Sequence, residues 1–186
     1  MPVADEVAQG LKAPLDLVLV RKIGMPRSPE LALGAIAGPD GKTQVLNAEL
    51  ASLFGIDAST IDAQAAPERA ELVRRHNLWG ARLKPGALNG RVEILVDDGI
   101  ATGATMQAAI AAVRDDHPVR VVVATPIAAP EALDRLSHYA DEVICLSASP
   151  AFSAVGRHYE SFPQLRDEDV RAILAASVSR PAPLKN

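Results

Sequence analysis

Four short runs of apolar residues dominate the pattern of the chain, and each is rich in valine, isoleucine or leucine. They cover residues 15–22, 92–98, 119–125 and 141–146. Strands that are covered on both faces have near-continuous apolar runs of this length, rather than alternating apolar and polar positions. The pattern therefore predicts four buried strands.

Around these runs, apolar positions recur at helical spacing. Helices are predicted over residues 3–11, 103–114 and 167–178, with Asp167 as the cap of the last one. A fourth helix is predicted to begin at Pro130, because proline suits a first helical turn. Residues 103–114 are apolar nearly all round, so that helix should lie deep. Strands that alternate with helices predict an α/β fold, with an open, mostly parallel sheet and helices on both of its faces.

The second quarter of the chain follows a looser pattern. Residues 24–30 contain two prolines and a glycine, and they predict a flexible loop. A hairpin is predicted over residues 31–47, with its turn at residues 38–41. A helix is predicted over residues 57–78, and Pro67 is expected to interrupt it because proline lacks the N–H group that an inner helical position donates.

Composition narrows the class of protein. The chain has 186 residues, 48% hydrophobic and 23% charged, which fits one folded domain, predicted over residues 1–179 with a frayed tail at 180–186. The net charge of −4 and the few aromatic residues (one Trp, two Tyr and three Phe) argue against a nucleic-acid partner. No apolar run approaches the roughly 20 residues of a membrane helix, so no membrane partner is expected. The single Cys145 and the acidic start predict a cytoplasmic protein.

Residues 94–106, ILVDDGIATGATM, carry the candidate chemistry. A predicted strand delivers Asp97 and Asp98 at its carboxyl end, where ligands of open α/β sheets bind. The turn that follows opens a helix whose first N–H groups suit a phosphate, and its glycine allows close approach of the backbone. This turn consists of Ala101, Thr102, Gly103, Ala104 and Thr105. Because two adjacent carboxylates can accept hydrogen bonds from a vicinal diol, the segment predicts a site for a phosphorylated sugar.

This segment resembles the loop by which type I phosphoribosyltransferases bind 5-phosphoribosyl-1-pyrophosphate (PRPP). The resemblance implies that Asp97 and Asp98 contact the ribose hydroxyls and stabilise an oxocarbenium-like transition state, while residues 101–105 hold the 5-phosphate. It also implies Mg²⁺ bound mainly through PRPP, phosphoribosyl transfer to a nucleobase or related acceptor with release of pyrophosphate, a small hood with a flexible loop, and a homodimer. Enzymes for 6-oxopurines carry a third acid where this chain has Ala101, and the sequence does not identify the base.

Two other groups of residues fit the same resemblance. Arg21 and Lys22 end a predicted strand, where several members of the family bind pyrophosphate. The alternative for them is an ordinary basic pair on the surface. Phe152 and Tyr159 follow the last predicted strand, where the family often stacks an aromatic ring on the base, and local packing is the alternative. No group of Cys and His has the spacing of a zinc site, so no protein-held metal is predicted.

The resemblance is incomplete at the start of the chain. The family carries a strand and a glycine-bearing pyrophosphate loop ahead of the helix that begins PVADEVA, whereas this sequence opens at that helix. The strand is expected between those that end at Lys22 and Asp98, so the domain is interpreted as incomplete at its amino end, with a mis-called or truncated start and a genuine short form as the alternatives. Two alternatives to an active transferase stay open: a non-catalytic PRPP-binding regulator, and an inactive truncated fragment.

Overall fold

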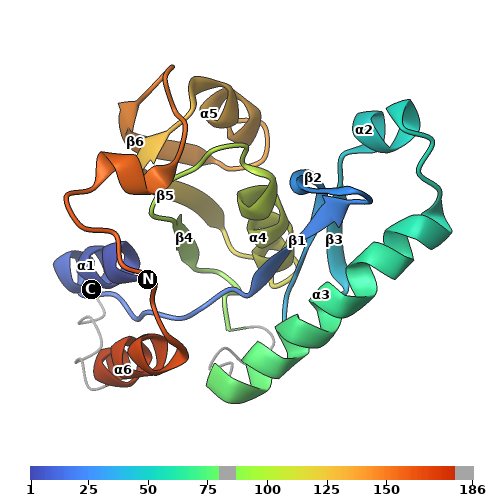
Figure 1. Cartoon of the computed structure of the whole chain (residues 1–186). Helices are drawn as coiled ribbons and strands as arrows, with labels where there is room; N and C mark the ends of the chain where they lie inside the picture. The colour runs from blue at the N-terminus through green and yellow to red at the C-terminus, as the bar shows by residue number, and fades with distance from the viewer. Residues whose placement is uncertain (80–86, 179–186) are drawn as a thin grey trace.

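The computed structural model of the chain describes residues 1–79 and 87–178. Within them, two three-stranded sheets lie on either side of helix α4 (Ala104–Arg114) (Figure 1). One face of α4 packs Ala108 against the first sheet, and Ile110 belongs to the core of the second. The prediction that this helix lies deep is confirmed, because five of its residues are buried.

The second sheet is parallel and carries the predicted α/β pattern. Its order is β4 (Val92–Val96), β5 (Arg120–Ala128) and β6 (Glu142–Ala148), and α4 and α5 (Pro130–Leu136) connect these strands. The three strands predicted in this half of the chain are confirmed, although β5 is longer than expected. The side chains between this sheet and its two helices form the largest buried apolar cluster of the described residues. The α/β fold class is therefore confirmed.

The first sheet is antiparallel, and the sequence pattern predicted only its β2–β3 pair. Its order is β1 (Val20–Met25), β2 (Ser28–Ala37) and β3 (Thr43–Leu46). The strand predicted at residues 15–22 begins at Val20 instead and pairs with β2, so it is not a member of the parallel sheet. The predicted hairpin is confirmed as the pair of β2 and β3.

The prediction of a flexible loop at residues 24–30 is wrong. Strands β1 and β2 continue through it and leave only Pro26 and Arg27 between them. Arg27 has a φ of 67°, and a proline followed by a left-handed residue is typical of a tight turn. Proline and glycine therefore mark the bend of a hairpin here, not the ends of a longer loop.

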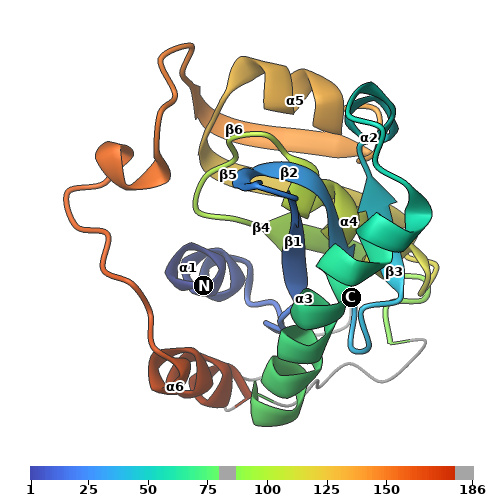
Figure 2. The same ribbon diagram turned by 45° about the vertical axis from the view of Figure 1, so that its right-hand side comes forward.

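Three helices frame the two sheets on the outside: α1 (Pro2–Leu11), α3 (Ala58–Trp79) and α6 (Asp167–Val178). Helix α3 covers the face of the antiparallel sheet opposite α4, while α6 contacts both α1 and α3 (Figure 2). The prediction that Pro67 interrupts the helix is wrong, because α3 continues on both sides of this residue. Ala65 and Leu72 are fully buried on either side of Pro67, and this packing holds the helix continuous.

The start of α6 matches the prediction at Asp167, but the cap differs. The backbone N–H of Arg166 donates to the Asp169 carboxylate at 2.8 Å. Between the antiparallel sheet and α3 lies a short helix that the pattern did not predict, α2 (Ala48–Leu53), capped by Asn47. The predicted tail at residues 180–186 lies outside the described residues.

Candidate active site

The paired carboxylates lie where β4 ends. The backbone N–H of Asp97 still donates to Ala124 on β5, at 3.2 Å, and the backbone N–H of Asp98 donates to Oδ1 of Asp97 at 2.9 Å. Burial raises the pKa of Asp97 to about 6, and the neighbouring charge of Asp98 acts in the same direction. The structure thus places both predicted carboxylates at one strand end, with a proton held on Asp97 more tightly than on an ordinary aspartate.

The loop after Asp98 is fixed to the end of β5. The backbone N–H of Ile100 donates to Ile127 at 3.0 Å, and the Ile100 carbonyl accepts from Ala129 at 2.9 Å. Gly99 fits against Val155, since a Cβ at this position would lie 2.7 Å from a methyl carbon of that valine. Glycine is therefore required here by close packing. The loop presents the next residues in one defined orientation.

The predicted phosphate cradle, residues 101–105, opens α4 as expected. Gly103 is the N-cap residue with a φ of 78° and has no side chain to cap the helix, while the N–H of Ala104 donates to Oγ1 of Thr102 at a long 3.5 Å. The first N–H groups of a helix have no partner within it, so they are available to an anion. Ala101, Thr102 and Thr105 are exposed beside them. Substitution of Gly103 would strain the backbone and bring a Cβ within 3.3 Å of Leu136, so it would disturb the fold as well as the cradle.

A cation that the sequence pattern did not reveal lies at this cradle. Arg135 comes from the last turn of α5, and its Nη1 donates to the backbone carbonyl of Thr102 at 3.3 Å. The two residues are 33 positions apart, and an arginine in the last turn of a helix has an ordinary explanation in the helix dipole. No local signal could have identified it.

The two predicted pyrophosphate residues do not act as a pair. Neighbouring residues of a strand point to opposite faces of the sheet. Arg21 points to α3, where its Nε and Nη2 lie 2.7 Å and 2.6 Å from Oε2 of Glu68. Lys22 therefore lies on the other face of β1, the face on which Val20 packs against α4. Only one of the two basic side chains can face the parallel sheet and its carboxylates.

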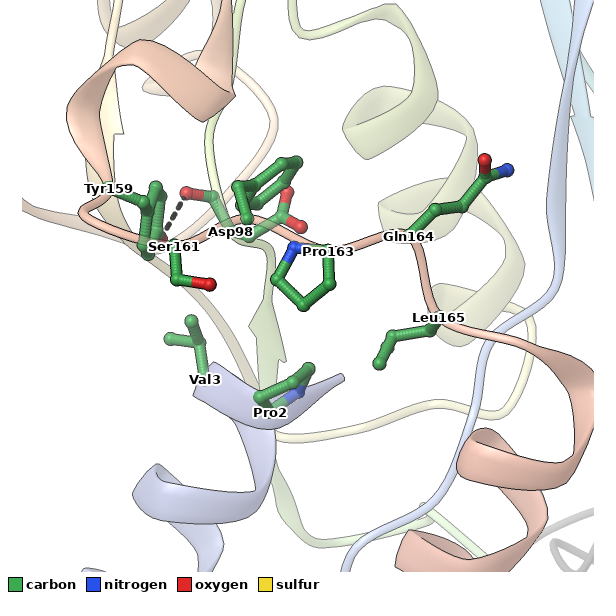
Figure 3. Close-up of a pocket in the computed structure, with 9 residues that line it drawn as sticks. Pro2, Val3, Asp98, Tyr159, Ser161, Pro163, Gln164 and Leu165 are labelled. Carbon is green, nitrogen blue, oxygen red and sulfur yellow. Dashed lines mark hydrogen bonds between the residues drawn. The ribbon is translucent and has the colours of Figure 1, made fainter.

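The predicted aromatic residues take different positions. The hydroxyl of Tyr159 donates to the backbone carbonyl of Asp98 at 2.6 Å, which ties the segment after β6 to the carboxylate loop (Figure 3). Phe152 instead stacks on His158, with ring centroids 5.6 Å apart. The ring of Tyr159 lies beside that of Phe162, with ring centroids 5.2 Å apart. Only Tyr159 of the two predicted residues lines the pocket beside Asp98.

That pocket has a volume of about 350 Å³ and a largely apolar lining. Figure 3 shows the start of α1 on one side of it, and the segment from Tyr159 to Leu165 on the other. Asp98, Ser161 and Gln164 are polar residues of its lining, although Figure 3 shows the amide of Gln164 directed away from it. The remaining lining residues are Pro2, Val3, Tyr159, Phe162, Pro163 and Leu165. A flat, mostly apolar molecule with a few hydrogen-bonding edges fits such a lining.

The described residues contain no group of three or more His, Cys, Asp or Glu that could hold a metal ion. In the same part of the chain, no helix is long and apolar enough to cross a membrane.

Comparison with known proteins gives consistent results. The family model of the phosphoribosyl transferase domain matches residues 1–160. Proteins of two Mycobacterium tuberculosis strains, CDC 1551 / Oshkosh and H37Rv, are each 44% identical over 174 residues, which is 94% of this chain. Their names assign them provisionally to the phosphoribosyl transferases, and the chain spans 39% of their length.

A solved structure supports the fold. The crystal structure of TT1426 from Thermus thermophilus is 47% identical and superimposes with a TM-score of 0.75. The match covers 94% of this chain and 81% of that one.

Proposed function

The chain belongs to the phosphoribosyl transferase family, and from this premise we propose that it binds PRPP and transfers the phosphoribosyl group to a nucleobase or related acceptor, with release of pyrophosphate. One observation carries the proposal. Asp97 and Asp98 directly follow β4, and the same short loop leads to the first turn of α4, where the N-cap residue Gly103 has no side chain to cap the helix. A diol-binding pair and a phosphate cradle thus lie a few residues apart on one fixed loop, as a 5-phosphoribosyl group requires.

In this proposal the 5-phosphate occupies the cradle. The N–H groups of the first turn of α4 donate to it, with hydroxyl donors from Thr102 and Thr105. Arg135 donates to the Thr102 carbonyl and would add positive charge beside the phosphate. The ribose then extends toward β4, where its two hydroxyls donate to Asp97 and Asp98.

The reaction breaks the bond from the anomeric carbon to the pyrophosphate oxygen and forms a bond from that carbon to an acceptor nitrogen. The bonding electrons leave with pyrophosphate, and the acceptor loses its proton to the surrounding water. Positive charge develops on the ribose ring during this exchange, and the carboxylates of Asp97 and Asp98 stabilise it. Asp97 must be ionised to contribute, so its raised pKa makes this contribution depend on pH.

Magnesium fits the same end of the site as an ion that arrives with PRPP. When bound, it neutralises charge on the departing pyrophosphate. Carboxylate oxygens are the ligands it prefers, and Asp97 and Asp98 are the residues of this loop that could contact it.

Lys22 is the better placed candidate for the pyrophosphate, because it lies on the face of β1 that packs against α4, whereas Arg21 points to α3. The pocket beside Asp98 is the candidate acceptor site. Tyr159 offers a ring that its hydrogen bond to Asp98 holds in place, and Ser161 offers a hydroxyl group. Base stacking on Phe152, a homodimer and a cytoplasmic location stay predictions.

The test combines PRPP binding with turnover. PRPP and Mg²⁺ are titrated into the chain in a calorimeter, and pyrophosphate release is then measured with a panel of purine and pyrimidine bases. Asp98→Asn keeps the size of the side chain but removes its negative charge. A hydrogen bond to an ionised group contributes about 1.5–3 kcal/mol, and this contribution to binding the transition state would be lost. We expect turnover to fall about ten- to a hundredfold.

The matched control is Asp62→Asn, which changes an exposed aspartate of α3. It is expected to leave binding and turnover unchanged. Wild-type turnover by Asp98→Asn would remove this carboxylate from the mechanism. Tight PRPP binding without pyrophosphate release for any base would instead favour the non-catalytic regulator.

A further inference from the structure

The pocket beside Asp98 carries negative charge without a cation to balance it. Among the residues of its lining that the structure describes, Asp98 is the one acid, and none is Lys, Arg or His. Pro2 and Pro163 of the same lining also have no backbone N–H group to donate. The pocket beside Asp98 is therefore poorly suited to hold an anion (Figure 3).

The basic side chains that flank the segment 159–165 along the chain have partners outside this lining. The guanidinium of Arg157 donates to the hydroxyl of Ser153 at 3.2 Å. Arg166 pairs with two acids in the first turn of α6. The ring of His158 stacks on Phe152. The cations closest in sequence are thus already engaged by other groups.

The charge of the carboxylates reaches the wall of the pocket. Burial raises the pKa of the Tyr159 hydroxyl, and the charges of Asp98 and Asp97 raise it further. The negative potential that opposes ionisation of this hydroxyl also opposes the entry of any other anion.

This potential separates the ligands of the proposed reaction. Phosphate groups bind to cations and to helix N–H groups, which this chain offers at the start of α4 and on β1 rather than in the pocket. The pocket is left for the acceptor. Its volume of about 350 Å³ is at the small end of the range of ligand pockets, about 300–1,000 Å³, and suits one compact ring system.

A carboxylate on the acceptor would lose its water beside Asp98 with no cation to replace it. Burial of an unpaired charge is costly, and two like charges brought together repel. A neutral ring avoids both costs. Its N–H groups can donate to the Asp98 carboxylate, and the Ser161 hydroxyl can donate or accept.

We propose that the acceptor is an uncharged, compact ring that carries neither a carboxylate nor a phosphate group, and that the Asp98 side of the pocket rejects anionic acceptors. This inference rests on the proposed function and restricts its acceptor to one chemical class. Asp98 then has two roles, because it contacts the ribose and also selects the charge of the molecule that attacks it.

The test compares matched pairs of rings that differ in charge. Each pair is a carboxamide and the carboxylate of the same ring: nicotinamide and nicotinate, orotamide and orotate, purine-6-carboxamide and purine-6-carboxylate. Adenine, cytosine and uracil complete the panel. Binding is measured by calorimetry with Mg²⁺ and ribose 5-phosphate, which has the 5-phosphate and the diol but no pyrophosphate to lose. Pyrophosphate release is then measured with PRPP.

We expect every pair with measurable binding or turnover to favour the carboxamide about tenfold or more. Asp98→Asn should reduce this preference in the binding measurement, because it removes the like charge. Ser161→Lys should reduce or invert it, because it places an ammonium group in the pocket. The matched control is Ser52→Lys, which adds the same charge at an exposed position of α2 and should leave the preference unchanged.

A carboxylate that binds or reacts as well as its carboxamide would overturn the proposal. Normal PRPP binding without a response to any uncharged member of the panel would overturn it as well, and so would equal effects of Ser161→Lys and Ser52→Lys. Each of these results leaves PRPP binding intact. A wild-type chain that does not bind PRPP would instead refute the proposed function, and this inference with it.

Discussion

Arg135 fixes the backbone of the phosphate cradle through its hydrogen bond to the Thr102 carbonyl. We predict that Arg135→Ala weakens PRPP binding about threefold to tenfold, since one such hydrogen bond contributes about 1 kcal/mol. The measurement is calorimetric titration with PRPP and Mg²⁺. The free energy of unfolding should change little, because the side chain is exposed.

Arg114→Ala is the matched control for this variant. Arg114 also lies in the last turn of a helix and donates to a backbone carbonyl, that of Tyr139 at 2.8 Å, but it lies at the other end of α4 from the cradle. It should leave PRPP affinity unchanged. If the two variants lost affinity equally, the role of Arg135 at the cradle would be refuted.

The residues of the site differ in how far the sequence could predict them. Asp97, Asp98 and residues 101–105 follow one another along a strand, a turn and a helix, so local pattern placed them correctly at one strand end. Arg135 joins them only because α5 packs back on the loop, and no pattern in one segment records such a contact. Tyr159 was predicted beside the site, but its hydrogen bond to the Asp98 backbone depends on the path of the segment after β6.

At the scale of elements, the alternation of side chains along β1 separates Arg21 from Lys22. We predict that Lys22→Ala weakens PRPP binding, while Arg21→Ala lowers the free energy of unfolding and leaves PRPP binding nearly unchanged. A double-mutant cycle of Arg21→Ala with Glu68→Gln should give a coupling of about 0.5–1 kcal/mol in urea unfolding, because both side chains are about one-third exposed.

Lys22→Ala with Glu68→Gln is the comparison cycle and should show no coupling. The assignment of the two faces would be wrong if Arg21→Ala lost PRPP affinity as strongly as Lys22→Ala while stability stayed the same. In that case Arg21 would leave Glu68 when the ligand binds.

Helix α3 contains a proline, Pro67, that lowers the stability of the helix although packing keeps it continuous. Pro67 is exposed, lacks the N–H group for the carbonyl of Ala63 and crowds that carbonyl. We predict that Pro67→Ala raises the free energy of unfolding by about 1–3 kcal/mol. Pro26→Ala is the control, because the ring of Pro26 suits the turn between β1 and β2, and it should give no gain. Urea unfolding measures both, and equal changes would contradict this account of α3.

The sequence predicted best those elements that are buried on both faces, because such elements have a continuous run of apolar residues. Strands β4, β5 and β6 belong to this group, and their order follows from the helices between them. The antiparallel sheet is different, because β2 alternates small residues that fit closely against neighbours. A Cβ on Gly34, for example, would lie 2.4 Å from the carbonyl of Val45. Whether residues 24–30 form a loop or a hairpin depends on such contacts, which sequence periodicity does not contain.

At the scale of the whole molecule, two partly buried carboxylates set the dependence of stability on pH. Burial raises the pKa of Glu93 to about 7 from 4.5, with Asp16 adding to the shift, and raises that of Asp97 to about 6 from 3.8. The folded chain therefore keeps protons that the unfolded chain has already released between about pH 4 and pH 7. Stability must then fall as the pH rises through this range.

Carboxylates whose pKa is lowered in the folded chain do not obscure this effect. The arginines beside Glu71 lower its pKa to about 2, so its contribution is lost only as the pH falls below about 4.5. The window between pH 5 and pH 8 thus reports mainly on Glu93 and Asp97 among the acids with shifted pKa values.

We predict that the Tm of the chain is higher at pH 5 than at pH 8. Glu93→Gln and Asp97→Asn should each raise the Tm at pH 8 and reduce its change with pH, and the double variant should nearly abolish that change. Asp97→Asn should do so while it lowers turnover, as expected of a residue that ionises for function at the expense of stability. The measurement is thermal unfolding across this pH range, and a pH dependence that both variants left intact would mean that other groups control it.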